Sequence, residues 1–102
     1  MLFRIKTGVD VTGLRPEMVP ALLAAYGIRA VLLGGDLVLT SAREGDHRSG
    51  SRHFVGLALD FRTRDLLPRE RSRFASELRA ALGDQYDVLL EGDHLHVEFD
   101  PR

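Results

Sequence analysis

Cysteine is absent from this chain of 102 residues. Disulfide bonds and thiolate metal sites are therefore both excluded. Any metal ion must be held by imidazole and carboxylate groups, a ligand set that suits zinc.

An excess of charge of either sign is also absent, because 14 Lys and Arg residues face 15 Asp and Glu residues. A net charge of -1 gives no overall attraction to nucleic acid or to anionic lipid. Aromatic residues make up only 7%, which gives nucleic-acid binding little support. The hydrophobic share of 44% and the charged share of 28% are typical of a soluble globular protein, here one domain over residues 1–102.

Long apolar runs are missing as well. No segment approaches the roughly 18 apolar residues that a membrane helix needs, and residues 1–6 do not begin a charged leader followed by an apolar stretch. We therefore expect no membrane insertion and synthesis in the cytoplasm. Any work outside the cytoplasm would need another export or release route.

Apolar periodicity predicts two helices and several short strands. The first helix is expected over residues 15–26, with Pro16 in its first turn and Gly27 at its stop. The second is expected from Pro68 to about Leu82, and the polar segment 41–52 is expected to be a loop. Strands are expected over residues 2–5, over 57–62, and over 30–33 and 37–40 as a hairpin around Gly34-Gly35-Asp36.

The C-terminal segment predicts a second hairpin, in which residues 86–91 and 94–99 flank Gly92-Asp93. Gly followed by Asp suits a two-residue type II′ turn. That turn pairs Glu91 with His94 and Leu89 with His96. Strand alternation then makes one face apolar, and it gives the other face two histidines and several carboxylates. The polar face receives Asp87, Leu89, Glu91, His94, His96 and Glu98.

The expected fold is α+β, a small and mainly antiparallel sheet with two helices on its apolar face. A zinc site would lie on the opposite face, in a groove walled by the loop of residues 41–55.

Three features of the sequence indicate metal. His53 precedes Asp60 by seven residues, and Asp60 lies on the outward face of its expected strand. His94 and His96 are two residues apart, so a strand directs both imidazoles to one side. Acidic residues lie beside them. A catalytic zinc needs three protein ligands and one open position, and two histidines with one aspartate meet that count.

At these residues the sequence resembles a known group of enzymes. Residues 51–60, SRHFVGLALD, match the S-x-H-x-x-G-x-A-x-D signature of D-Ala-D-Ala metallopeptidases. With His94-Leu95-His96, residues 39–99 resemble the wider group of those enzymes, lysostaphin-type endopeptidases and the hedgehog signalling domain. The likeness is greatest to small phage and prophage members that cut peptidoglycan peptides.

The resemblance implies a role for each matching residue. It makes His53, Asp60 and His96 the zinc ligands, because the second histidine of H-x-H binds the metal in that family. His94 would stabilise the tetrahedral intermediate or steer a proton. Arg43 stands near the place of the family's arginine, which would bind a substrate carboxylate or polarise a carbonyl.

Two carboxylates compete for the role of general base. The family usually has an acid three residues before the last ligand, and Asp93 occupies that place. Glu91 forms E-x-x-H with His94 and lies on the histidine face of the expected hairpin, whereas Asp93 lies in the turn. The family spacing favours Asp93, and the register favours Glu91.

Simpler explanations exist for several of these residues. Arg43 is explained almost equally well as a surface cation of the loop. His94 and His96 are explained less well as polar residues of an outer face than as members of the site. Four further residues, Glu44, Asp46, His47 and Glu98, are expected to face solvent without a role.

By resemblance, we expect a zinc peptidase that acts on peptidoglycan stem peptides or cross-links containing a D-residue. Metal-activated water would attack the amide carbonyl. The site of action would be the periplasm or cell wall after phage-type release. The alternative is a non-catalytic binding module or virion structural module of the same fold.

Overall fold

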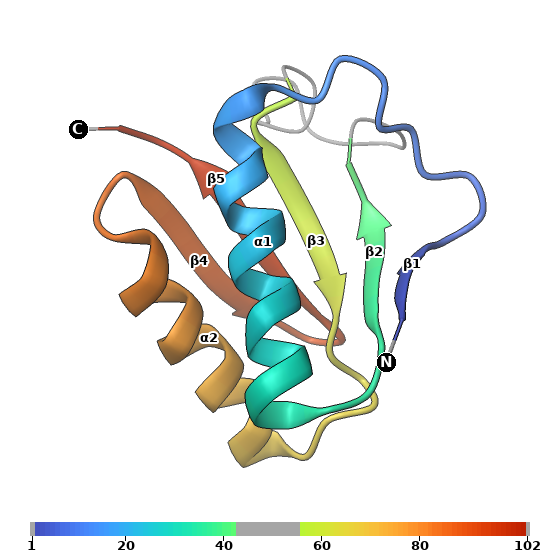
Figure 1. The fold of residues 1–102 in the computed structure, drawn as a ribbon, viewed down its shortest axis with the longest axis vertical. Helices are drawn as coiled ribbons and strands as arrows, with labels where there is room; N and C mark the ends of the chain where they lie inside the picture. Colours follow the sequence, from blue (N-terminus) through green and yellow to red (C-terminus); the bar gives the residue numbers. More distant parts are fainter. Residues whose placement is uncertain (1, 43–55, 102) are drawn as a thin grey trace.

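A computed structural model describes residues 2–42 and 56–101 and has an α+β fold (Figure 1). Its five strands form one sheet in the order β1-β2-β3-β5-β4. Only β1 and β2 pair in parallel, so the sheet is mainly antiparallel, as the sequence predicts. The strands are β1 (Phe3–Ile5), β2 (Leu37–Ser41), β3 (Ala58–Arg62), β4 (Tyr86–Glu91) and β5 (His94–Phe99). The helices are α1 (Val19–Ile28) and α2 (Pro68–Leu82), with a 3₁₀ turn η1 (Pro16–Met18) and a π-helical segment η2 (Arg29–Leu33) flanking α1.

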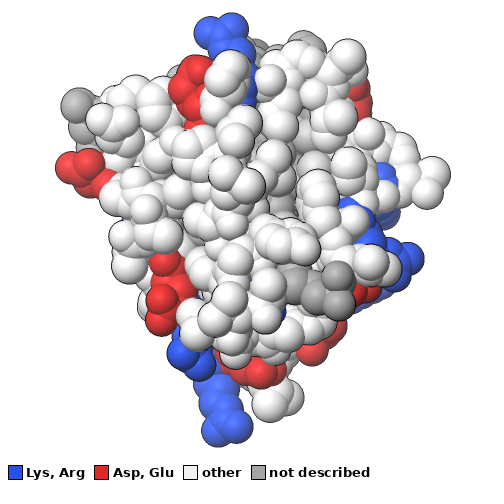
Figure 2. Space-filling model, in the orientation of Figure 1, with Lys and Arg blue, Asp and Glu red and all other residues white. Residues whose placement is uncertain are grey.

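Both α-helices lie on the same face of the sheet (Figure 1), and the core is between the two layers. Alternate strand residues such as Leu59, Phe61 and Leu95 are fully buried against Phe74 and Leu78 of α2. The helical face of the molecule is largely without charge at its centre, and charged side chains gather toward its edges (Figure 2). The polar residues of β3 and β5 therefore point to the opposite side of the sheet.

Helix α2 begins and ends where the sequence predicts. Pro68 occupies the first turn, and the Glu70 side chain accepts a hydrogen bond of 2.8 Å from the Leu67 backbone N–H. Gly83 follows the helix with φ 79°, a conformation that glycine adopts at little cost.

The prediction of a strand over residues 30–33, and of a hairpin around Gly34-Gly35-Asp36, is wrong. The first helix does not stop at Gly27 but continues through Ile28 into η2, which ends at Gly34 with φ 75°. A short apolar run has no periodicity that distinguishes a strand from a buried helix. The helical conformation of residues 29–33 is stabilised by a contact with a distant part of the chain. The buried Arg29 side chain pairs with Asp65, which precedes α2.

The C-terminal hairpin has the predicted register. Glu91 pairs with His94, Leu89 with His96 and Val88 with Val97. The two-residue turn at Gly92-Asp93 sets this register, and it thereby sets which side chains face away from the core. The prediction of a type II′ turn is wrong, because Gly92 does not have the positive φ that the first central residue of that turn requires.

The segment Pro16–Leu33 is long and apolar enough, by length and composition, to cross a membrane, with a mean hydropathy of 1.4. The expectation that no segment approaches this length is wrong, because the predicted helix ended before Gly27 and the observed helix continues through it. Core helices of soluble proteins and signal sequences meet the same criterion. In this fold Met18, Ala21 and Ala25 of the segment are fully buried in the core.

Candidate functional site

The candidate site lies on the face of the sheet opposite to the helices, where β3 and β5 are neighbours. The antiparallel register sets Asp60 of β3 beside His96 of β5, and Arg62 beside His94. Because alternate residues of a strand share a face, all four side chains lie on one side of the sheet. The two strands thus bring together residues that are more than thirty positions apart in the sequence.

His96 is held between two carboxylates. Its Nδ1 lies 2.8 Å from Oδ1 of Asp60, and its Nε2 lies 2.8 Å from Oε1 of Glu98. Asp60 and His96 are nearly buried, with 13% of each side chain exposed. Burial disfavours the charged imidazolium, but hydrogen bonds to Asp60 and Glu98 outweigh it and raise the pKa of His96 to about 9. A carboxylate oxygen faces each ring nitrogen, and both nitrogens can donate a hydrogen bond only when the ring is protonated.

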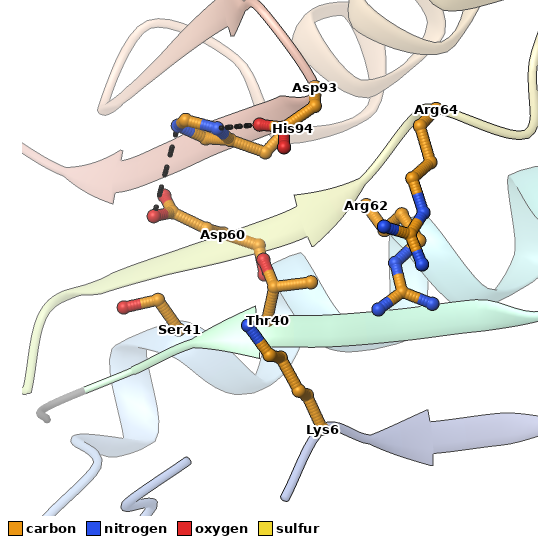
Figure 3. Close-up of a pocket in the computed structure, with 8 residues that line it drawn as sticks. All are labelled: Lys6, Thr40, Ser41, Asp60, Arg62, Arg64, Asp93 and His94. Atoms are coloured by element: carbon orange, nitrogen blue, oxygen red, sulfur yellow. Dashed lines mark hydrogen bonds and ion pairs between the residues drawn. The ribbon is translucent and has the colours of Figure 1, made fainter. Parts of the chain in front are cut away.

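His94 lies beside the same aspartate and is closer to the surface. Its Nε2 is 3.9 Å from Oδ2 of Asp60 and 3.8 Å from Oε1 of Glu91, and its Nδ1 is 3.1 Å from Oδ1 of Asp93 (Figure 3). Asp60 therefore has one histidine near each of its carboxylate oxygens.

A cleft of about 240 Å³ opens beside Asp60 and His94. Figure 3 shows its walls, which come from four strands or their ends. It is lined by Lys6, Thr40, Ser41, Asp60, Arg62, Arg64, Asp93 and His94. The pairing of β2 with β3 shifts by one residue at Thr40, whose hydroxyl donates to the Asp60 carbonyl at 3.3 Å. Such a bulge redirects side chains locally, and this one adjoins the cleft.

Gly56 leads from the segment 43–55 into β3. Its φ is 78°, and an added Cβ would lie 2.3 Å from the carbonyl oxygen of Gly13. The Gly56 carbonyl also accepts a hydrogen bond of 2.9 Å from the backbone N–H of Arg15. Only glycine fits this close approach at the entry to the strand.

The donor atoms present suit zinc. Nitrogen Nδ1 of His96 and oxygen Oδ1 of Asp60 already face each other, as two ligands of one ion must. At zinc–ligand bonds of about 2.0–2.1 Å, tetrahedral ligands stand about 3.3 Å apart. A separation of 2.8 Å therefore requires a movement of only about half an ångström, within side-chain reach. The predicted third ligand, His53, and the predicted arginine, Arg43, lie outside the described residues.

Both candidate bases lie within reach of His94. Asp93 is the closer of the two, at 3.1 Å against 3.8 Å for Glu91, and it lines the cleft. The turn position of Asp93 does not turn its carboxylate away from the histidines, contrary to the register argument. The hydrogen bond from His94 holds the pKa of the Asp93 carboxyl below its usual value.

Glu98 corrects one expectation, because it does not simply face solvent. Its side chain is 22% exposed and is in hydrogen-bond contact with His96. The signal was present in the sequence: Glu98 is two residues after His96 on the same strand, and therefore on the same face. Three cations of the cleft, Lys6, Arg62 and Arg64, were missed. Arg62 could have been found, since it is two residues after Asp60 on the same strand face, but Lys6 comes from a distant segment.

A second group of carboxylates lies at the edge of this region. Asp87, Glu98 and Asp100 place their oxygens within 4.8 Å of one another, and all three are partly exposed. Acidic groups of this kind are common on protein surfaces without a bound ion, and the donors of this group are all carboxylates.

Comparison with models of known protein families finds no match to this chain, and no curated protein matches it either.

Proposed function

We propose that this chain is a zinc-dependent peptidase that hydrolyses peptides of the bacterial cell wall. The observation that carries the proposal is the convergence of His96 and His94 on the two oxygens of Asp60, beside an open cleft. Imidazole and carboxylate donors at one point are the ligands of catalytic zinc, and the cleft leaves room for a substrate.

Each residue has a distinct task in this proposal. Asp60 and His96 hold the metal together with His53, and bound zinc would supply Lewis-acid chemistry and a reactive water. Asp93 or Glu91 accepts a proton and returns it to the leaving amine. His94, hydrogen-bonded to Asp93, orients that carboxylate and carries positive charge toward the developing oxyanion when it is protonated.

The substrate class rests on the resemblance of residues 51–60 to D-Ala-D-Ala metallopeptidases. Five positions of that decapeptide match the signature, and its last residue, Asp60, is in contact with His96. We therefore propose a substrate bond in a stem peptide or cross-link that includes at least one D-residue.

The metal site is tested by zinc content after dialysis against trace zinc. We expect one zinc per chain in the wild type and a loss of zinc in His53→Ala, Asp60→Asn and His96→Ala. His47→Ala is the matched control, because it removes a histidine six residues before His53 in the sequence and should retain the metal. Wild-type protein that retains no zinc after this dialysis would refute the proposal.

Activity is tested by digesting purified sacculi with zinc-loaded protein and identifying new termini by mass spectrometry. Released peptides are expected from the wild type, and none from Asp60→Asn. Replacing Asp93 and Glu91 one at a time, as Asp93→Asn and Glu91→Gln, identifies the base as the variant with the larger loss of kcat.

A non-catalytic module of the same fold is the second candidate. Its support is that His96 makes two hydrogen bonds with carboxylates of the chain, so this cluster is satisfied without metal. Metal-replete protein that releases no fragment over a wide pH range would favour this candidate over the peptidase.

A further inference from the structure

We infer that Lys6, Arg62 and Arg64 form a subsite for the terminal carboxylate of the peptide substrate. The inference rests on the proposed function for the position of the cleaved bond. The three cations line the same cleft as Asp60 and His94.

The cations lie on one side of the candidate metal ligands. Arg62 follows Asp60 by two residues on the same face of β3, which places their Cα atoms about 6.6 Å apart. In Figure 3 the side chains of Arg62 and Arg64 lie beside each other, and Lys6 approaches from the strand at the opposite wall. The cleft thus has an acidic end with the histidines and a cationic end.

The cations have no ion-pair partner in the described part of the chain. Within residues 2–42 and 56–101, no carboxylate lies within 4.0 Å of the side-chain nitrogens of Lys6, Arg62 or Arg64, whereas Arg4 and Arg29 have such partners. The two carboxylates of the cleft have histidines as their nearest partners, Asp60 with His96 and Asp93 with His94, although Arg64 also attracts Asp93 at longer range. Like charges gathered in one cleft repel one another, and an anionic ligand removes that repulsion.

A carboxylate fits this position by charge, shape and distance. A guanidinium presents parallel N–H donors that match the two oxygens of a carboxylate. Consecutive Cα atoms of a peptide are about 3.8 Å apart, so a terminal carboxylate lies about one residue beyond the last amide carbonyl. The spacing from Asp60 to Arg62 spans one to two residues. Under the proposed function, a terminal carboxylate held by these cations would place the cleaved bond near the C-terminus of the peptide.

The test compares two peptides that differ only at the C-terminus. N-acetyl-L-Lys-D-Ala-D-Ala with a free carboxylate, and its C-terminal amide, are titrated into the full chain and followed by NMR. Both the metal-free protein and zinc-loaded protein with a catalytically silent base (Asp93→Asn, Glu91→Gln) are used. We expect the free acid to bind about tenfold more tightly than the amide.

Variants of the cleft cations test whether they cause the tighter binding of the free acid. Arg62→Gln and Arg64→Gln should weaken binding of the acid and leave binding of the amide unchanged. Arg64 is exposed, so its replacement does not disturb the core. Arg69→Gln, which removes an exposed cation of α2 on the other face, is the matched control and should bind both peptides like the parent protein.

Equal affinity for acid and amide in the parent protein would overturn the subsite. An Arg62→Gln variant that binds both peptides more weakly by the same factor would also overturn it. A third contrary result is a short oligonucleotide that displaces the acid at a lower concentration than acetate does. The failure of the proposed function is separate. Suppose that the protein binds no zinc, but that the metal-free form still binds the acid more tightly than the amide and loses this preference in Arg62→Gln. The subsite is then supported and the proposed peptidase function is refuted.

Discussion

At the scale of single residues, the surroundings of His96 decide what the candidate site can bind. The ring has a carboxylate at each nitrogen, Asp60 at Nδ1 and Glu98 at Nε2. A zinc ion at Nδ1 would replace the proton shared with Asp60, while the hydrogen bond to Glu98 would remain. A carboxylate at the second nitrogen of a ligating histidine fixes the tautomer and increases its basicity.

In the metal-free protein, His96 is expected to titrate near pH 9, because two carboxylates stabilise its protonated form against burial. This pKa is above the unfolded value of about 6.5. The contribution of His96 to the free energy of unfolding is therefore fully present below about pH 6.5 and is lost as the pH rises through about 9. NMR of the imidazole protons and urea unfolding over this range measure both. Titration of His96 near pH 6.5 would contradict the prediction, and Glu98→Gln should lower its pKa.

Glu98 is expected to support zinc binding without being a ligand. Glu98→Ala should weaken zinc affinity by about 10–100-fold, since it removes the partner that orients His96. Glu98→Gln retains an acceptor oxygen and should lose less. Competition with a chromophoric chelator measures both affinities. Glu91→Gln is the control, because among the described metal-site side chains Glu91 lies near His94 and has no ion pair with Asp60 or His96. Wild-type affinity in Glu98→Ala would refute the role.

At the scale of elements, Gly27 and Gly56 both lie near the predicted end of an element, but they differ in backbone conformation and in the space around them. Gly27 follows the predicted end of the first helix, but the helix continues through it, and an added Cβ would meet nothing within 4 Å. Gly56 lies at the entry to β3 with a positive φ and with the Gly13 carbonyl against it. Local sequence does not separate these two cases, because the difference lies in the backbone that packs against each glycine.

Alanine at the two positions should change stability in opposite directions. Gly27→Ala is expected to stabilise the protein by about 0.5–1 kcal/mol, because alanine is the better helix former and the site has room. Gly56→Ala should destabilise it by at least about 1 kcal/mol through strain and the contact with Gly13. Urea unfolding monitored by circular dichroism measures both. A stabilised Gly56→Ala variant would contradict the described entry into β3.

At the scale of the whole molecule, what the sequence predicts well is local. The Gly92-Asp93 turn and strand alternation correctly predict the register of the C-terminal hairpin, and with it the shared face of His94 and His96. The conformation of residues 29–33 depends on Arg29 reaching Asp65, a contact across 36 positions that no local pattern contains. Lys6 was missed for the same reason, since it follows β1 and reaches the cleft only after β1 has paired with β2.

This separation of layers has a consequence for stability. The core lies between the sheet and the helices, and the candidate site lies on the other face, so a conservative change at the site should not disturb the core. Asp60→Asn keeps the size of a side chain that is only 13% exposed and removes its charge. The folded state should therefore persist in this variant, while its affinity for metal falls.

Zinc should raise the thermal stability of the wild type through this site alone. A ligand at about one hundred times its dissociation constant stabilises the folded state by about 2.7 kcal/mol. In a domain of this size that corresponds to an increase in Tm of roughly 10–20 °C. Differential scanning calorimetry with and without zinc at pH 7.5 measures the shift. Asp60→Asn and His96→Ala should show little of it, and His47→Ala should show all of it. A shift of equal size in Asp60→Asn would place the metal elsewhere, because the aspartate in contact with His96 would then contribute nothing to binding.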